Sequence, residues 1–255
     1  MTGPRFPDLD GVSVFLTGGG SGIGAELTRG FLEQGAQVTF VQRSDASGFV
    51  DEMEVATGNR PTFIPCDVTD TDALRRAISR TSEIQGPVTV LVSNAANDQR
   101  HSTLEVDEDF WEWSTAINLK SYFFAAQAVI PGMQAAGGGS IILFSSISYM
   151  MGNAGYPVYA ASNSGINGLA RSLAREFGGD RIRVNALAPG WVLTDKQLEM
   201  WATEEDLKAH MDRMCLKEHL KPQDIVAPCL FLASSASAGM TGQALVVDGG
   251  VVVTG

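Results

Sequence analysis

The 255-residue chain is poor in cysteine and histidine, with three of each. The cysteines form neither a CxxC pair nor a zinc-like spacing, which indicates ordinary reduced thiols rather than a disulfide framework. The histidines also lack a metal-ligand signature, so we expect no metal site. The six residues are Cys66, Cys215, Cys229, His101, His210 and His219.

Positive charge is also in short supply. Lysine and arginine number 18 against 29 aspartates and glutamates, which gives a formal net charge of −11. Because nucleic-acid affinity depends largely on lysine and arginine contacts to phosphate, we expect no nucleic-acid partner. Small molecules and further copies of the chain remain as partners.

Long apolar runs are missing as well. No stretch approaches the roughly 18 uninterrupted apolar residues that a membrane-spanning helix needs. The opening MTGPRFPDLD has no apolar core of a secretory signal peptide. We therefore expect a cytoplasmic protein with no membrane partner.

The composition that is present is that of a globular protein, with 44% hydrophobic and 18% charged residues. Short apolar, β-branched runs alternate with longer stretches of helical pattern. Strands are expected over residues 12–17, 37–42, 61–66, 88–93, 140–145, 182–188 and 244–248. Helices are expected near residues 22–34, 70–84, 107–136, 158–177 and 223–233.

This alternation predicts an α/β fold with parallel strand pairing and right-handed crossovers. We expect a single doubly wound Rossmann-type domain over residues 1–255, with a seven-stranded, mainly parallel sheet. The stretch TDTD at 69–72 supplies capping oxygens for the helix that follows it. The segment of about residues 191–221 interrupts this alternation of strands and helices, and we interpret it as a substrate-facing insert.

A glycine-rich turn, TGGGSGIG, follows the first predicted strand and precedes a helix. Gly18, Gly22 and Gly24 have the GxxxGxG spacing at a strand–turn–helix junction. Glycines let the backbone turn tightly and let a pyrophosphate approach the positive end of the helix. This context favours dinucleotide binding over a simple flexible turn.

Polar residues follow the next three strands of the predicted sheet. Asp67 and Asn94 come at carboxyl ends, where side chains meet a ligand in this architecture, although both types also cap turns. The second strand ends in neutral Gln42 and then Arg43, where an acidic residue would repel the 2′-phosphate of NADP. We therefore favour NADP, or use of both NADP and NAD, with a solvated arginine as the alternative.

The segment YPVYAASNSG, residues 156–165, places Tyr159 and Asn163 four positions apart, on one face of a helix. Hydride transfer to or from carbon requires a proton to move from or to the substrate oxygen, and a phenol can carry it. A free tyrosine has a pKa near 10, so about one in a thousand is ionised at neutral pH. A nearby cation would increase that fraction.

Motifs spread over nearly the whole chain resemble those of the classical short-chain dehydrogenase/reductase family. They are TGGGSGIG, CDV, SNAA, INL, SS at 145–146, YAASN, APGWVLT and VDGG. The resemblance implies an NAD(P)-dependent oxidoreductase in which Tyr159 is the catalytic acid/base, Ser146 binds the same oxygen and Asn118 holds a proton-relay water. It also implies cofactor contacts at Gly18, Ser21, Gly22, Ile23, Gly24, Gln42, Arg43, Asp67, Val68, Asn94, Ala95, Ala96, Tyr159, Asn163, Pro189, Gly190, Val192 and Thr194.

The chain departs from the family at one catalytic position. Where the family pattern YxxxK has a lysine, this sequence has Asn163, which can bind a ribose hydroxyl but carries no charge. Three interpretations follow: an enzyme with a less ionised tyrosine and an alkaline optimum, a substitution introduced into a chain that had lysine, or a protein that binds the cofactor without useful turnover.

The loop NDQRHSTLEV places charged and imidazole groups beside the predicted active site. Such groups suit the hydroxyls of a sugar, although a solvated surface loop is the alternative. NDQRH, PGMQAAGGGSII, WATEEDLK and CLKEHLKPQDIVAPCLFLAS resemble bacterial sugar 1-dehydrogenases of the xylose dehydrogenase type, which oxidise an aldose at C1 to a lactone. The substrate candidates are Asp98, Arg100, His101, Ser146, Ser148, Asn153, Tyr159 and Trp191, with Tyr149 and Trp201 as further wall residues.

Two other functions remain open. One is a 3-oxoacyl carrier-protein reductase, but the mixed charges of the 191–221 segment offer no positive surface to an acidic carrier. The other is a nucleotide-sensing or scaffold protein, which only Asn163 suggests. The family resemblance also implies a homotetramer.

Overall fold

The computed structural model describes residues 3–253. Within them, seven parallel strands form one sheet in the order β3-β2-β1-β4-β5-β6-β7. The strands are β1 (Ser13–Thr17), β2 (Gln37–Gln42), β3 (Thr62–Pro65), β4 (Val90–Ser93), β5 (Gly139–Phe144), β6 (Ile182–Pro189) and β7 (Ala244–Val247). Strands β1, β4 and β5 are almost wholly buried, as expected for a sheet that helices cover on both faces.

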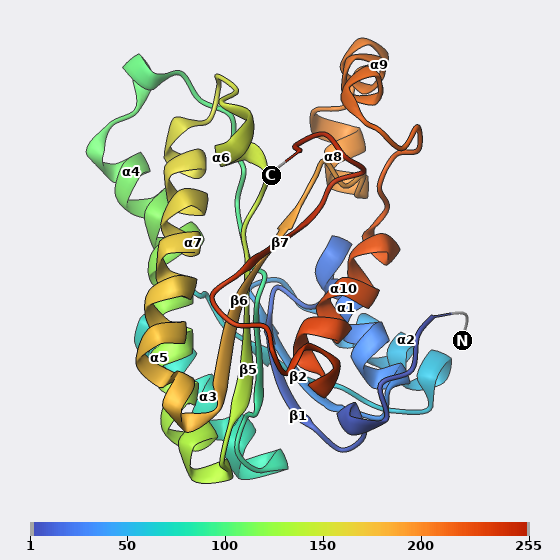
Figure 1. Ribbon diagram of the computed structural model, residues 1–255, viewed down its shortest axis with the longest axis vertical. Helices are drawn as coiled ribbons and strands as arrows, with labels where there is room; N and C mark the ends of the chain where they lie inside the picture. Colours follow the sequence, from blue (N-terminus) through green and yellow to red (C-terminus); the bar gives the residue numbers. More distant parts are fainter. Residues whose placement is uncertain (1–2, 254–255) are drawn as a thin grey trace.

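Helices lie on both faces of this sheet (Figure 1). Their bounds are α1 (Gly22–Glu33), α2 (Ser47–Thr57), α3 (Thr71–Gln85), α4 (Glu108–Thr115), α5 (Ser121–Ala136), α6 (Ser148–Met151), α7 (Pro157–Phe177), α8 (Asp195–Met200), α9 (Glu204–Arg213) and α10 (Val226–Ala233). Among residues 3–253, none of the helices is long and apolar enough to cross a bilayer.

Two hydrophobic cores hold the layers together. One packs α3, α5 and α7 against the sheet through side chains such as Leu74, Val129 and Ile166. The other packs α1, α2 and α10 against the opposite face through Phe31, Met53 and Leu230. The doubly wound arrangement predicted from the alternation of strands and helices is confirmed.

The chain reverses its winding direction between β1 and β4, which are neighbours in the sheet. Their carboxyl ends are joined where Thr17 Oγ1 accepts hydrogen bonds from the backbone N–H groups of Asn94 and Ala95, both at 3.0 Å. In open α/β sheets, ligands bind in the crevice beyond such a reversal. The topology therefore places a binding site at this edge.

Several elements differ from the sequence-based expectation. The sheet is entirely parallel rather than mainly so, and α10 begins at Val226 after a 3₁₀ turn at Pro222–Ile225. The helix expected near 107–136 is interrupted by a π-helical turn at Ala116–Lys120. Helices α2 and α6 were not predicted, because α2 buries little beyond Val50 and Met53 and α6 has a single turn.

Candidate active site

A cavity of about 1170 Å³ lies at the carboxyl edge of the sheet. Its walls come from the glycine-rich turn, the segments that follow β2 to β6, the first turns of α7, and helices α8 and α9. The predicted dinucleotide turn and the predicted catalytic pair therefore line one continuous space. Within residues 3–253 there is no cluster of three or more His, Cys, Asp or Glu side chains that could hold a metal ion.

The glycine turn has a shape that other residues would not allow. Gly18 and Gly22 have φ angles of +72° and +52°, and a side-chain carbon at Gly24 would overlap the carbonyl oxygen of Gly18. Ser21 is the N-cap of α1, but its side chain makes no capping hydrogen bond. Backbone N–H groups at this helix end thus remain available to a phosphate, so the residues fit a dinucleotide.

The Gln42 side chain hydrogen-bonds to this glycine turn. Its Oε1 accepts a hydrogen bond from the backbone N–H of Gly20 at 2.9 Å, and its Nε2 donates to the Ser44 carbonyl and hydroxyl, each at 3.1 Å. The Arg43 side chain lines the cavity and is 68% exposed. It lies 3.9 Å from Asp67 Oδ2, a loose pairing that leaves most of its donors open to a ligand.

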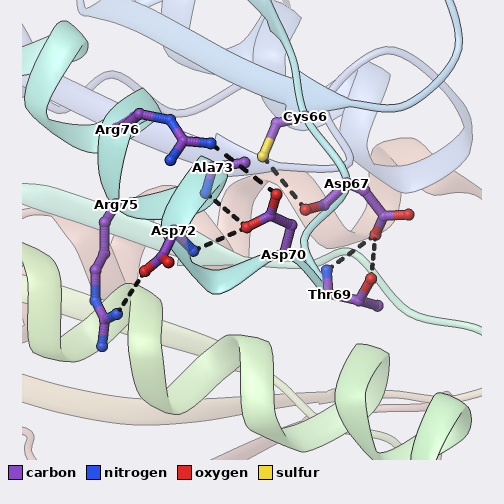
Figure 2. A network of polar contacts seen from close by, with 8 residues as sticks. All are labelled: Cys66, Asp67, Thr69, Asp70, Asp72, Ala73, Arg75 and Arg76. Carbon is purple, nitrogen blue, oxygen red and sulfur yellow. Dashed lines mark hydrogen bonds and ion pairs between the residues drawn. The ribbon is translucent and has the colours of Figure 1, made fainter.

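Asp67 lines the cavity and also orders the turn before α3 (Figure 2). Its Oδ1 accepts hydrogen bonds from the Thr69 backbone N–H at 2.9 Å and from the Thr69 hydroxyl at 2.8 Å. Asp70 caps α3 by accepting from the N–H groups of Asp72 and Ala73, as the TDTD stretch predicts. The turn-capping and ligand-facing interpretations of Asp67 are therefore compatible, because each uses a different carboxylate oxygen.

Asn94 braces the glycine turn from the neighbouring strand. Its Nδ2 donates to the carbonyls of Thr17 at 3.1 Å and Gly18 at 3.2 Å. The remaining predicted cofactor residues Val68, Ala95, Ala96, Pro189, Gly190, Val192 and Thr194 also line the cavity, whereas Gly22 lies just behind it, against Thr194.

Ser146 and Tyr159 both line the cavity, and their side chains hydrogen-bond to each other. Ser146 follows β5, and Tyr159 lies in the first turn of α7, so the sheet edge and the helix start bring them together. Burial, followed by the negative charge of Asp98, raises the pKa of Tyr159 to about 12, while hydrogen bonds with the Asn163 and Ser146 side chains act in the opposite direction. A phenol in this setting is strongly protonated at neutral pH.

Asn163 does not line the cavity. It is only 2% exposed, and its Nδ2 donates to the backbone carbonyl of Tyr159 at 2.9 Å. The backbone carbonyl of Asn163 accepts from Ser145 Oγ at 3.1 Å and Asn167 Nδ2 at 2.8 Å. Asn163 is thus held in a buried network next to Tyr159 and is not part of the cavity wall.

Asn118 is also buried behind the site, within the π-helical turn. Its Oδ1 accepts from the Asn97 N–H at 2.8 Å, and its Nδ2 donates to the Asn97 carbonyl at 2.9 Å and to Ser114 Oγ at 3.3 Å. This paired contact fixes the start of the loop that carries Asp98 and Arg100.

The predicted substrate residues divide into two groups. Asp98, Arg100, Ser148, Asn153, Trp191 and Trp201 line the cavity, but His101 and Tyr149 do not. His101 Nδ1 contacts the Gln99 carbonyl at 2.9 Å, and the N–H of Val158 points at its Nε2 at 3.3 Å. Its ring packs on Phe110 with centroids 4.8 Å apart, so His101 supports the start of α7 instead of facing the cavity as expected.

Sequence reasoning missed the residue that joins the two walls of the cavity. Gln197 Oε1 accepts from Trp191 Nε1 at 2.9 Å, and Gln197 Nε2 donates to Asp98 Oδ2 at 2.8 Å. Lys196 Nζ lies 3.6 Å from the other Asp98 oxygen. Helix α8 is too short for its spacing to indicate such a contact. Tyr156, Met151, His210 and Arg213 also line the cavity and were not predicted.

Comparison with known proteins defines the class. A family model described as enoyl-(acyl carrier protein) reductase matches residues 18–252. A "Probable galactose dehydrogenase" of Rhizobium meliloti (strain 1021) is 45% identical over 249 residues, covering 97% of each chain. The D-xylose 1-dehydrogenase of Caulobacter vibrioides is 40% identical over 251 residues, covering 98% of this chain and 99% of the relative.

A solved structure agrees with these relatives. A candidate NAD(P)-dependent gluconate 5-dehydrogenase from Beutenbergia cavernae, solved with bound NADP at low occupancy, superposes with a TM-score of 0.89 at 32% identity and covers 96% of this chain and 98% of that one. The chain belongs to the short-chain dehydrogenase/reductase family, and it is an NAD(P)-dependent oxidoreductase. A 3-oxoacyl-[acyl-carrier-protein] reductase of Thermotoga maritima is more distant, at 33% identity.

Proposed function

We propose that the protein oxidises the C1 hydroxyl of an aldose to a lactone, with Tyr159 as the acid/base. The observation that carries this proposal is the meeting of Ser146 and Tyr159 in the same cavity as the glycine-rich turn. The sugar dehydrogenases among its relatives support the substrate class, because two of them match nearly the whole chain.

The two polar side chains have distinct parts in the proposed reaction. NAD(P), when bound, accepts the hydride that leaves C1. Ser146 holds the C1 oxygen by a hydrogen bond, and the Tyr159 phenolate removes the hydroxyl proton, so that carbon and oxygen lose a hydride and a proton together. With a Tyr159 pKa of about 12, only about one molecule in 10⁵ carries the phenolate at neutral pH. We therefore expect an alkaline optimum.

We propose NADP as the favoured cofactor. The exposed Arg43 guanidinium after β2 can pair with a 2′-phosphate, and the last residue of β2 is the neutral Gln42 rather than an acidic residue. We propose further that the 191–221 segment covers the substrate, since Trp191, Gln197 and Trp201 line the cavity.

We also propose a homotetramer assembled through α4, α5 and α7, the helices of residues 107–136 and 158–177. Trp111 on α4 is 50% exposed and Phe123 on α5 is 41% exposed, so both rings are available to pack against a neighbouring subunit. Sedimentation equilibrium would measure the assembly, and a monomer at micromolar concentration would contradict this part of the proposal.

The test of function is a panel of aldoses with NADP or NAD, following the absorbance of the reduced cofactor against pH. We expect reduction of the cofactor with aldoses and a decrease in kcat of about 10²–10⁴-fold for Tyr159→Phe, with unchanged cofactor affinity. Turnover only with 3-oxoacyl thioesters would contradict the sugar assignment. Tight cofactor binding without turnover at any pH would instead favour a cofactor-binding protein with impaired catalysis.

A further inference from the structure

The guanidinium group of Arg100 lies over two aromatic rings at the wall of the cavity. Its Cζ is 4.2 Å from the centroid of the buried Tyr156 ring and 5.8 Å from that of Trp201. Contacts of this kind are favourable because the ring faces carry negative charge. They hold a flexible side chain in one place without using its N–H donors.

Those donors have no partner in the part of the chain that the structure describes. Within residues 3–253, the Arg100 guanidinium makes no hydrogen bond or ion pair. The two nearby cavity-lining carboxylates are engaged elsewhere. Asp98 contacts Gln197 and Lys196, and Asp206 accepts a 2.6 Å hydrogen bond from the Thr203 hydroxyl.

A second arginine of the cavity wall, Arg213, also has no carboxylate partner within residues 3–253. Arg213, at the end of α9, lines the cavity and forms no ion pair with any carboxylate among the described residues. In a chain with a net charge of −11, the cavity is lined by four cationic side chains and three carboxylates, and Arg100 and Arg213 are the two of these cations that form no ion pair among the described residues. The excess of positive charge is local, and it suits an anion.

We propose that Arg100 binds a carboxylate at the end of the substrate away from the reacting carbon, so that the preferred substrate is an acidic aldose of the hexuronic acid type. The Tyr156 and Trp201 rings pack against the guanidinium without using its N–H groups, and these parallel donors match a carboxylate in bidentate geometry. Arg100 packs on the Tyr156 ring, and that ring lies 6.1 Å from the Tyr159 ring between centroids, so the guanidinium and the phenol belong to neighbouring parts of one cavity. This inference depends on the proposed function, because it assigns the far end of the same substrate.

The experiment compares each hexuronic acid with the aldose that differs only at C6: galacturonate with galactose, and glucuronate with glucose. We expect a higher kcat/KM for the acids, by about 10–100-fold. Arg100→Met should remove that preference by lowering kcat/KM for the acids more than for the neutral aldoses, and Arg100→Lys should retain part of it. Arg80→Met, on α3 outside the cavity, is the matched control and should behave as the unaltered protein.

A second measurement separates this inference from the proposed function. Titration of the unaltered protein and Arg100→Met with galacturonate and galactose, followed by tryptophan fluorescence, reads binding without turnover because Trp201 contacts Arg100. Absence of sugar oxidation together with Arg100-dependent galacturonate binding would overturn the proposed function and retain the carboxylate site. Equal or better kcat/KM and affinity for the neutral aldoses, or equal losses for both kinds of sugar in Arg100→Met, would overturn the inference and leave the proposed function standing.

Discussion

The side-chain Nδ2 of Asn163 donates a 2.9 Å hydrogen bond to the backbone carbonyl of Tyr159, one helical turn earlier in α7. Asn163 is neutral, so it brings no positive charge to the phenol. Its side-chain hydrogen bond with Tyr159 lowers the pKa of the phenol, but burial and the Asp98 charge raise that pKa by more.

A positive charge at position 163 should accelerate the reaction. We expect Asn163→Lys to increase kcat near neutral pH by about 10–1000-fold, because a cation close to a phenol lowers its pKa by roughly 1–3 units. The substitution removes one hydrogen bond to the Tyr159 carbonyl, which still has its helical partner. The measurement is the pH–rate profile of both proteins. Asn163→Gln, neutral and longer, is the control, and a similar gain in that variant would show that charge is not the cause.

Removing the negative charge of Asp98 should shift the same profile. The carboxylate disfavours the phenolate and so raises the pKa of Tyr159. Asp98→Asn should therefore move the alkaline limb of kcat to lower pH, by up to about one unit. The position of the limb is the readout, because Asp98 also contacts Gln197 and its loss can change the amplitude of kcat. A limb that stays in place, or moves to higher pH, would contradict this electrostatic account.

Arg43 should determine the choice between the two nicotinamide cofactors. We expect Arg43→Ala to raise KM for NADP by about 10–100-fold with little effect on KM for NAD, because only NADP carries the 2′-phosphate. Arg60→Ala, another exposed arginine outside the cavity, is the control. Equal effects on the KM values for the two cofactors would show that Arg43 does not recognise the 2′-phosphate.

Gly24→Ala should abolish cofactor binding and destabilise the fold. Its new side-chain carbon would overlap the Gly18 carbonyl oxygen, and the turn has no free space to absorb it. Gly48→Ala, in α2, meets no atom within 4 Å and should leave binding intact. Cofactor affinity by calorimetry and Tm together check the pair. Normal NADP affinity in Gly24→Ala would contradict the proposal that the glycine-rich turn binds the cofactor phosphates.

Much of the fold could be predicted from sequence because its causes are local. The seven strands are short apolar runs, and each lies within about two residues of its expected bounds. Helix α2 escaped prediction because its apolar face is narrow, and the π-helical turn around Asn118 escaped because nothing in a helical pattern marks one extra residue in a turn. The catalytic parts assigned to Ser146 and Tyr159 remain predictions, although both line the cavity.

The sequence alone determined the glycine turn and the alternation of strands and helices. Both follow from covalent geometry and hydrophobic spacing, which can be recognised within about ten consecutive residues. The folded chain was needed to show that Asn163 lies outside the cavity wall and that His101 contacts the start of α7. It was also needed to show that the N–H donors of Arg100 have no partner among the described residues. Such features depend on segments that meet only after the sheet forms: Gln197 reaches Asp98 across 99 positions of sequence, and no local pattern encodes that contact.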